Sequence, residues 1–261
     1  MKSLPTFVLI FLFLQHGNGL YQGTGAPANS ARFIASIRYR NLDHSFGSGF
    51  LCAASVINNF NVVTAASCVY NMQPSQINVA FGRIDLNSRY VVINIAQIRL
   101  HPKFDISDIM NDNIAVVRVT RNIRANTNAH IQIINLDSTP VIPSPCSFFA
   151  WGLENRLLRA TIPVNSENCH NQTDSTFCAG NVGGGPALCP RNLGGAYVCN
   201  SQLTGIAISV SGCTQPGTTG RLVAVNNYRD WILRGSAKST CKLDISLLSL
   251  LLIAVTQFLF I

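Results

Sequence analysis

The chain has 261 residues, of which 48% are hydrophobic and 11% are charged, and its formal net charge is +8. This length fits one large or two moderate domains and supplies enough apolar residues for a core. The low charge and high hydrophobicity exclude an intrinsically disordered chain. Much of the apolar character gathers at the two ends, where targeting and processing signals are expected.

Residues 1–19 have the pattern of a cleaved secretory signal. Lys2 precedes an uninterrupted apolar stretch over residues 7–14, and two glycines follow at positions 17 and 19. A transmembrane helix would need roughly 20 apolar residues, and this stretch is much shorter. We therefore expect the mature chain to enter the secretory pathway and to begin at Leu20.

Residues 235–261 have the pattern of a GPI-attachment signal. Gly235 and Ser236 are small, a short polar spacer follows, and residues 245–261 carry no charge. A transamidase replaces such a tail with a lipid. The alternative is a hydrophobic membrane tail, although it would be short and would lack a basic flank. We expect either the extracellular face of the plasma membrane or secretion, with a signal at 1–19, a body at 20–235 and a tail at 236–261.

The body is mildly basic. Residues 20–235 contain 16 Lys and Arg against 10 Asp and Glu, a net charge of about +6. Such a surface favours an acidic glycan or an anionic lipid over nucleic acid as a partner. The body histidines lack the spacing of metal ligands, so we expect no metal and no other cofactor; they are His44, His101, His130 and His170.

Short runs rich in Val, Ile, Phe and Tyr alternate with turn signals throughout the body, which indicates an all-β fold. The predicted strands are 33–39, 76–81, 90–98, 114–119, 147–151, 197–198 and 203–210. Late in the body, residues 225–234 resemble a helix. Many short strands with turns between them favour a sandwich or barrels.

Eight cysteines lie in the body, and in an exported protein this number implies a disulfide framework. They are Cys52, Cys68, Cys146, Cys169, Cys178, Cys189, Cys199 and Cys213. The ninth, Cys241, lies beyond the expected lipid site and would leave with the tail. Composition alone leaves the pairing open.

A series of motifs resembles those of the chymotrypsin-like (S1) serine proteases, in the same order. Residues 50–57 (FLCAASVI) and 61–68 (NVVTAASC) are similar to FCGGSLI and WVLTAAHC, and residues 113–117 (NIAVV) to DIALL. Further on, residues 146–152 resemble C...GWG, 178–180 match CAG, 189–199 occupy the place of CxGDSGGPLVC, and 227–232 that of NYxxWI. An alternative register, with residues 181–186 against GDSGGP, would not place Cys189 and Cys199 on family cysteines.

The resemblance covers nearly the whole body and implies the fold and the disulfides. The expected fold is two six-stranded Greek-key β-barrels, roughly 20–125 and 126–235, with a C-terminal helix. The implied pairs are Cys52 with Cys68, Cys146 with Cys199, Cys169 with Cys178, and Cys189 with Cys213.

All three positions of the family's catalytic triad are substituted. Ser67 stands at the histidine position, Asn113 at the aspartate position and Leu193 at the serine position. Hydrolysis in this family needs a nucleophile, a base and a carboxylate that orients the base. Asp112 adjoins Asn113, but an adjacent residue on a strand would face the other way. The resemblance therefore implies a pseudo-protease without catalytic residues.

The supporting positions are changed as well. Arg191 replaces the glycine of the oxyanion hole, and Asn192 replaces the aspartate that binds the new N-terminus after activation. Ala187 stands where trypsins carry the aspartate of the specificity pocket, so a basic side chain would lack a counter-charge. Residues 20–23 are similar to IVGG, yet no basic residue precedes them for an activating cut. Arg191 and Ala187 would then belong to a vestigial cleft suited to an apolar side chain.

The triplet Asn171-Gln172-Thr173 is an N-glycosylation acceptor between Cys169 and Cys178. In an exported chain we expect Asn171 to carry a glycan.

The preferred hypothesis is an inactive serine protease homologue that binds a protease, a protease substrate or an acidic glycan, as a cofactor or decoy. A rival hypothesis is an endopeptidase that uses Ser67 or Ser209 as nucleophile, with a histidine from a loop. A third is a heparin-binding antimicrobial role, since residues 64–68 resemble azurocidin. The fourth is an adhesion or structural module whose cleft is filled by Arg191 and Leu193.

Overall fold

The computed structural model describes residues 20–27, 29–42, 49–82, 91–127, 130–141, 146–152, 156–165, 169, 172–181, 183–210, 212 and 219–234. Several predictions fall outside these ranges, namely those on the signal, on the tail with its lipid sites Gly235 and Ser236, and on Asn171, Cys213, His44 and His170. Within the described ranges, no helix is both long and apolar enough to cross a bilayer.

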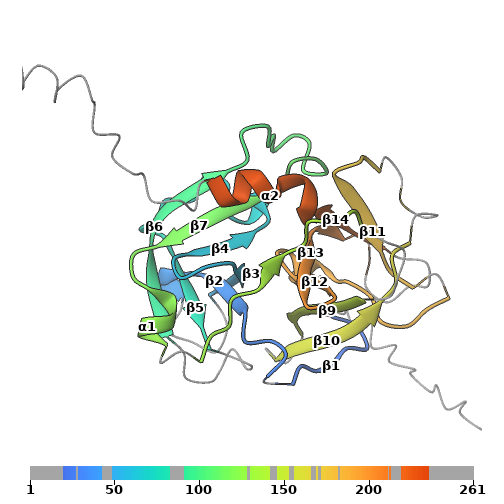
Figure 1. Ribbon diagram of the computed structural model, residues 1–261, viewed down its shortest axis with the longest axis horizontal. Helices are drawn as coiled ribbons and strands as arrows, with labels where there is room; N and C mark the ends of the chain where they lie inside the picture. The colour runs from blue at the N-terminus through green and yellow to red at the C-terminus, as the bar shows by residue number, and fades with distance from the viewer. Residues whose placement is uncertain are drawn as a thin grey trace, which may run out of the picture.

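The first half of the body is a closed barrel of six strands in the order β2-β3-β4-β7-β6-β5 (Figure 1). All neighbouring strands that are paired in register are antiparallel. The strands are β2 (Ile34–Tyr39), β3 (Phe50–Val56), β4 (Asn61–Thr64), β5 (Ile77–Phe81), β6 (Val91–Leu100) and β7 (Ala115–Val119). The 3-10 helices η1 (Arg40–Leu42) and η2 (Ala66–Cys68) follow β2 and β4, and the short helix α1 (Ile123–Asn126) follows β7. Branched apolar residues pointing inward fill this barrel.

The second half forms a sheet with strand order β1-β10-β9-β12-β13-β14-β11, and β8 pairs with β13. Its strands are β1 (Thr24–Gly25), β8 (Asn135–Leu136), β9 (Cys146–Trp151), β10 (Leu157–Ile162), β11 (Thr176–Ala179), β12 (Ala196–Cys199), β13 (Gln202–Val210) and β14 (Gly220–Ala224). An antiparallel bridge between Val164, just after β10, and Ala179 of the last strand β11 connects β10 to β11. The resemblance implied six strands in this half, and β9–β14 correspond to them. The short strands β1 and β8, of two residues each, are additional.

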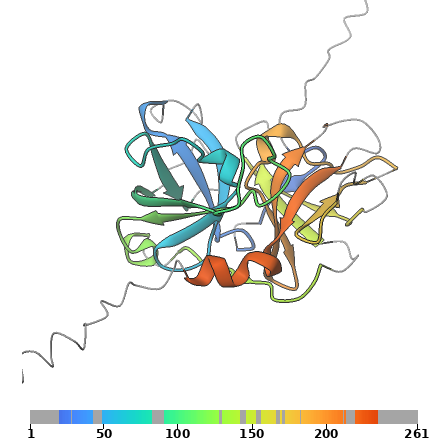
Figure 2. The same ribbon diagram turned by 90° about the horizontal axis from the view of Figure 1, so that it is seen from above.

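The first and last residues of each predicted strand lie within two residues of those observed. The helix α2 (Val225–Arg234) has the predicted bounds. The predicted runs did not include β3, β4, β10, β11 and β14, or the two-residue strands β1 and β8. In β10 and β14 the apolar run is interrupted by Arg159 and Arg221. Figure 2 shows the two barrels side by side, with α2 lying across one side of them.

Three of the implied disulfides are present, and they join Cys52 to Cys68, Cys146 to Cys199 and Cys169 to Cys178. Cys189 is also disulfide-bonded, and its expected partner Cys213 lies outside the described residues. The framework implied by the family resemblance is therefore confirmed for the described pairs.

The backbone at Gly194 connects the two halves at close range. Its φ of +75° lies in the left-handed region, and its N–H donates to the carbonyl of Ala207 at 2.8 Å. A Cβ atom at this position would run into the carbonyl oxygen of Ala53 and the hydroxyl of Thr64. Just before it, the Leu193 carbonyl accepts the N–H of Ala53 at 3.0 Å. Only glycine satisfies both the φ angle and the space.

We expect Gly194→Ala to destabilise the protein by about 3–5 kcal/mol, because the clash with Ala53 adds to the cost of the left-handed backbone. Thermal unfolding of the secreted protein measures the effect. Gly184→Ala is the matched control, since Gly184 has a φ of +90° but no atom within 4 Å of its Cβ position, and we expect it to cost only about 1 kcal/mol. Equal losses in the two variants would contradict the role given to the contact.

Helix α2 is fixed to the first barrel by a cluster around His101. Arg99 donates from Nη1 to the Trp231 carbonyl at 3.1 Å, and its guanidinium lies 4.0 Å from the centre of the Trp231 ring. His101 Nδ1 lies 3.2 Å from Asp112 Oδ1, which also accepts the Tyr228 hydroxyl at 3.1 Å. A cation at the C-terminus of a helix also offsets the helix dipole.

Burial lowers the pKa of His101 below its ordinary 6.5; the Asp112 carboxylate opposes this shift, and Lys103 and Arg99 add to it. The unfolded chain therefore takes up this proton more readily, so the stability from neutral His101 is present above about pH 6.5 and is lost as the pH falls. We expect His101→Asn to show a smaller drop in melting temperature between pH 7.5 and 5.5 than the wild type. His130→Asn, at an exposed position, should leave the wild-type drop unchanged; an equal effect there would refute the assignment.

Candidate functional site

The structure brings together two of the three substituted triad positions. Ser67 lies on η2, and Asn113 lies just before β7 and is fully buried. The Asn113 side chain accepts the Ser67 N–H at 2.8 Å through Oδ1 and donates from Nδ2 to the Ser67 hydroxyl oxygen at 3.2 Å. The same Nδ2 donates to the Ile109 carbonyl at 2.8 Å. An uncharged amide thus holds the Ser67 hydroxyl, and an amide cannot take up its proton.

Leu193 follows the 3-10 helix η3 (Pro190–Asn192), with φ −55° and ψ 137°. Its side chain is half-buried and packs against the main apolar core. The position therefore keeps a defined backbone, as described above for Ala53 and Gly194, but carries a hydrocarbon in place of a nucleophile.

Asp112 lies outside the Ser67–Asn113 pair, and the reason differs from the predicted one. We expected it on a strand, but β7 begins only at Ala115, and Asp112 has a left-handed φ of +49°. Its carboxylate contacts His101 and Tyr228 instead. A left-handed turn, rather than strand alternation, therefore directs the carboxylate away from Ser67.

Arg191, at the oxyanion-hole glycine position, lies beside a second arginine and two aromatic rings. Its guanidinium carbon is 5.1 Å from the centre of the Phe50 ring, and Phe50 packs edge-on against Trp151 with centroids 6.2 Å apart. Arg38 of β2 is almost fully buried and pairs in register with Phe50. Burial, and secondly the charge of Arg38, lower the pKa of Arg191. This corner of the former cleft is both cationic and aromatic.

In the family, an aspartate at the position of Asn192 forms an ion pair with the new N-terminus. Here Asn192 and the segment at Leu20 are held by other contacts. The side chain of Asn192 is fully buried, accepts the Cys189 N–H at 2.7 Å and donates to the Trp151 carbonyl at 3.3 Å. Leu20 is buried in the second core. Its neighbour Tyr21 exchanges backbone hydrogen bonds with Ala187, the buried residue at the specificity-pocket position. Backbone groups thus satisfy the amide that replaces the family's carboxylate.

Metal-binding geometry is not found in the described part of the chain, where no three His, Cys, Asp or Glu residues cluster suitably. The two histidines of that part have other surroundings. His101 packs edge-on against Tyr228 and Trp231 of α2, and His130, after α1, is exposed. Ser209 lies on β13, where it pairs in register with Arg221.

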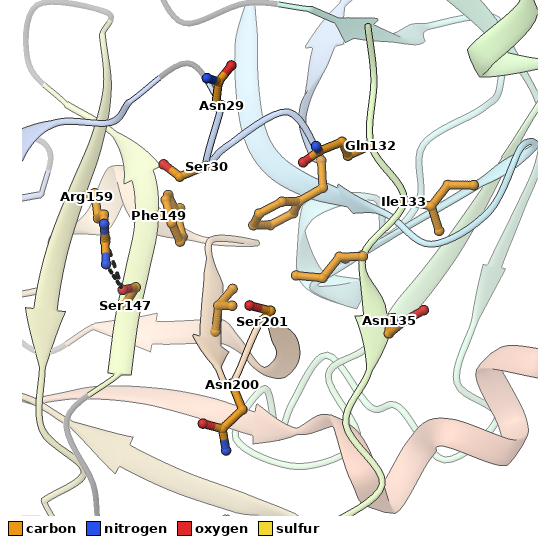
Figure 3. A pocket seen from close by; sticks show the side chains of 13 residues that line it. Asn29, Ser30, Gln132, Ile133, Asn135, Ser147, Phe149, Arg159, Asn200 and Ser201 are labelled. Carbon is orange, nitrogen blue, oxygen red and sulfur yellow. Dashed lines mark hydrogen bonds between the residues drawn. The ribbon is translucent and has the colours of Figure 1, made fainter. Parts of the chain in front are cut away.

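Two features were missed by the sequence analysis. The first is Arg38, whose signal was a single arginine inside the apolar strand IASIRY. The second is a polar pocket between the two halves, to which Arg159 contributes (Figure 3). It is formed by segments far apart in the sequence, and no local motif marks it.

Comparison with known proteins gives the family. A family model described as Trypsin matches residues 20–232. Serine protease 1 of Homo sapiens is 31% identical over 207 residues, which cover 72% of this chain and 81% of that protein. Snake venom serine protease 5 of Trimeresurus stejnegeri is 31% identical over 223 residues, which cover 75% of this chain and 83% of that protein. Protein C activator of Agkistrodon contortrix contortrix is 29% identical over 247 residues, which cover 84% of this chain and 98% of that protein. The match over nearly the whole body, together with the two-barrel fold, shows that this chain belongs to the trypsin family of chymotrypsin-like serine protease homologues.

Proposed function

We propose that this chain is a catalytically inactive member of the trypsin family, which acts outside the cell by binding a protein or an acidic glycan. The observation that carries the proposal is the hydrogen-bonded pair of Ser67 and Asn113, at the positions of the family's histidine and aspartate. In the family reaction a histidine takes the proton of the nucleophile, and a carboxylate stabilises the resulting charge. Here Asn113 carries no charge and Leu193 offers no nucleophile.

The size of the loss supports an inactive protein. In subtilisin, removal of the nucleophile or of the histidine alone lowers the rate about a millionfold, which corresponds to roughly 8 kcal/mol of barrier. The named relatives are proteases. This chain differs from the family pattern at all three triad positions, so its similarity to these proteases does not imply that it is catalytically active.

The alternative of a different serine nucleophile has less support. Ser67 and Ser209 are the candidates, and either would need a base within hydrogen-bond reach. Across the described residues, no hydrogen bond joins either serine to a histidine. The polar partner of the Ser67 hydroxyl is the Asn113 amide. A serine hydroxyl without a base is a weak nucleophile near neutral pH.

The former cleft has the character of a recognition surface. The half-buried Arg191 holds its guanidinium over the half-buried ring of Phe50. The neighbouring Arg38 and Trp151 are buried. Arginine and aromatic residues are the types most often found to dominate binding energy at interfaces. We infer that an acidic partner is recognised at this cleft, in keeping with the net positive charge of the body. A cleft filled by Arg191 and Leu193 would instead favour an adhesion or structural module.

We expect the protein to show no labelling by a fluorophosphonate probe and no turnover of a broad peptide library, with an active trypsin as the positive control. Ser67→Ala and Ser209→Ala test the two candidate nucleophiles and should leave this blank result unchanged. Labelling of the wild type that disappears in either variant would overturn the proposal and identify the nucleophile.

We also propose that residues 235–261 are exchanged for a GPI lipid. The small residues at Gly235 and Ser236, followed by a spacer and an uncharged stretch, support this assignment. Phosphatidylinositol-specific phospholipase C should release the protein from the surface of cells that express the full chain. A variant with Leu250→Arg and Leu251→Arg interrupts the apolar stretch and should prevent surface display. Surface protein that resists the enzyme would favour an ordinary hydrophobic anchor.

A further inference from the structure

A pocket of about 510 Å³ lies where three separate parts of the chain meet (Figure 3). One wall comes from residues 29–33 before and at the start of the first barrel, and another from the connecting segment 132–135. The third comes from β9, β10, β12 and the turn after β12. The pocket contains none of the former catalytic positions, so it is a second site. Its size falls within the range of small-molecule sites.

The lining is rich in groups that both donate and accept hydrogen bonds. Four residues with side-chain amides are among those that line the pocket, namely Asn29, Gln132, Asn135 and Asn200. The side chain of Asn135 points away from Ser147 and Ser201 (Figure 3). Three hydroxyls also line it, from Ser30, Ser147 and Ser201. The apolar part includes the rings of Phe33 and Phe149, which pack edge-on with centroids 5.6 Å apart. Amides and hydroxyls over an aromatic floor suit a ligand that carries many hydroxyl groups.

The charge of the pocket is positive. Arg159 is its charged lining residue, and its Nε and Nη2 donate to the Ser147 hydroxyl oxygen at 3.0 and 2.8 Å. Arg32 adds a second guanidinium beside the pocket, since its Nη2 donates to Asn29 Oδ1 at 2.7 Å. Asp and Glu are absent from the described lining residues. The two guanidinium groups would therefore attract an anionic group of a ligand, and no carboxylate among the described lining residues would repel it.

The turn at the edge of the pocket is held in a costly conformation. Asn200 and Ser201 have φ angles of +49° and +61°, and they join β12 to β13 as the two central residues of a tight hairpin. Such turns favour glycine, because a left-handed backbone costs other residues roughly 1–2 kcal/mol. The disulfide between Cys146 and Cys199 fixes the base of this turn next to Ser147. The cost of placing Ser201 here is consistent with a use for its hydroxyl in the pocket.

The strands that border the pocket do not offer an edge to a peptide. β9 is hydrogen-bonded to β10 and β12, and β12 is hydrogen-bonded to β9 and β13. Extended peptides are commonly bound by addition to an open strand edge, which these two strands lack. A compact polar ligand with one anionic group fits the lining better.

We propose that this pocket binds an acidic saccharide unit, with the Arg159 guanidinium on its carboxylate and the surrounding amides and hydroxyls on its hydroxyl groups. The inference deepens the proposed binding function, on which it rests, by naming the chemistry of one partner. The saccharide would then bind in the Arg159 pocket, and the cleft at Arg191 would contact a different acidic partner.

The test uses the full chain produced in a secretory host, and a hyaluronan tetrasaccharide as the probe in calorimetric titrations near physiological salt. Wild-type protein should bind the tetrasaccharide and not the fully N-acetylated chitotetraose, which is uncharged. Arg159→Gln should weaken binding at least tenfold. The matched control is Arg156→Gln, which removes the same charge from an exposed residue outside the pocket and should change the affinity less than twofold. A larger loss of affinity in Arg159→Gln than in Arg156→Gln would show binding at the pocket, as opposed to non-specific attraction by the positive charge of the protein.

A second variant guards against loss of folding in Arg159→Gln. Ser201→Gly removes a hydroxyl from the pocket and also relieves the left-handed backbone, so the melting temperature should rise or stay the same while affinity falls about threefold. No binding of the acidic tetrasaccharide, equal losses for Arg156→Gln and Arg159→Gln, or equal binding of chitotetraose would overturn the inference. Arg159-dependent binding of a glutamate-rich hexapeptide in place of the saccharide would also overturn it. Each of these failures leaves the fluorophosphonate result untouched, so the inactive-homologue proposal stands or falls separately.

Discussion

The backbone of Leu193 and Gly194 approaches the first barrel so closely that it hydrogen-bonds to both halves of the body. Ala53 donates to the Leu193 carbonyl at 3.0 Å, and Gly194 donates to the Ala207 carbonyl at 2.8 Å. Thr64 donates its hydroxyl to the Ala53 carbonyl at 2.7 Å. Together these bonds connect β3, β4 and β13 through one loop. Because they involve mainly backbone groups, they can persist after the side chains of catalysis are replaced.

The fold can be kept while the triad positions change, because backbone hydrogen bonds hold the two halves together and the catalytic side chains do not. In the family, the aspartate carboxylate orients the histidine and stabilises its protonated form. Ser67 and Asn113 form a neutral hydrogen-bonded pair at the same place. A buried carboxylate without a charged or polar partner would be costly. The amide of Asn113 avoids that cost, because its oxygen and nitrogen are all paired. Asn192 follows the same logic, with backbone partners at Cys189 and Trp151.

Positive charge marks both proposed recognition sites. At the former cleft, Arg191 lies over Phe50 and near the buried Arg38. At the second pocket, Arg159 is held by Ser147 and lies 5.9 Å from the centre of the Phe149 ring. In each case an aromatic ring or a hydroxyl holds a guanidinium in a partly buried position. Such pre-ordering reduces the entropy lost on binding and favours anionic partners.

The family, the strand-rich fold and the three substituted triad positions could be predicted from the sequence, because local motifs and residue types identify them. The disulfide pairs came from the resemblance to the family, and three of them are confirmed. The sequence also predicted α2 over residues 225–234, where the pattern is local. The hydrogen bond between Ser67 and Asn113, and the direction of Asp112 towards His101, became visible only in the folded chain. The tertiary structure alone assembled the Arg159 pocket from residues more than a hundred positions apart. Contacts between distant segments depend on how the two barrels pack, and no local pattern records that packing.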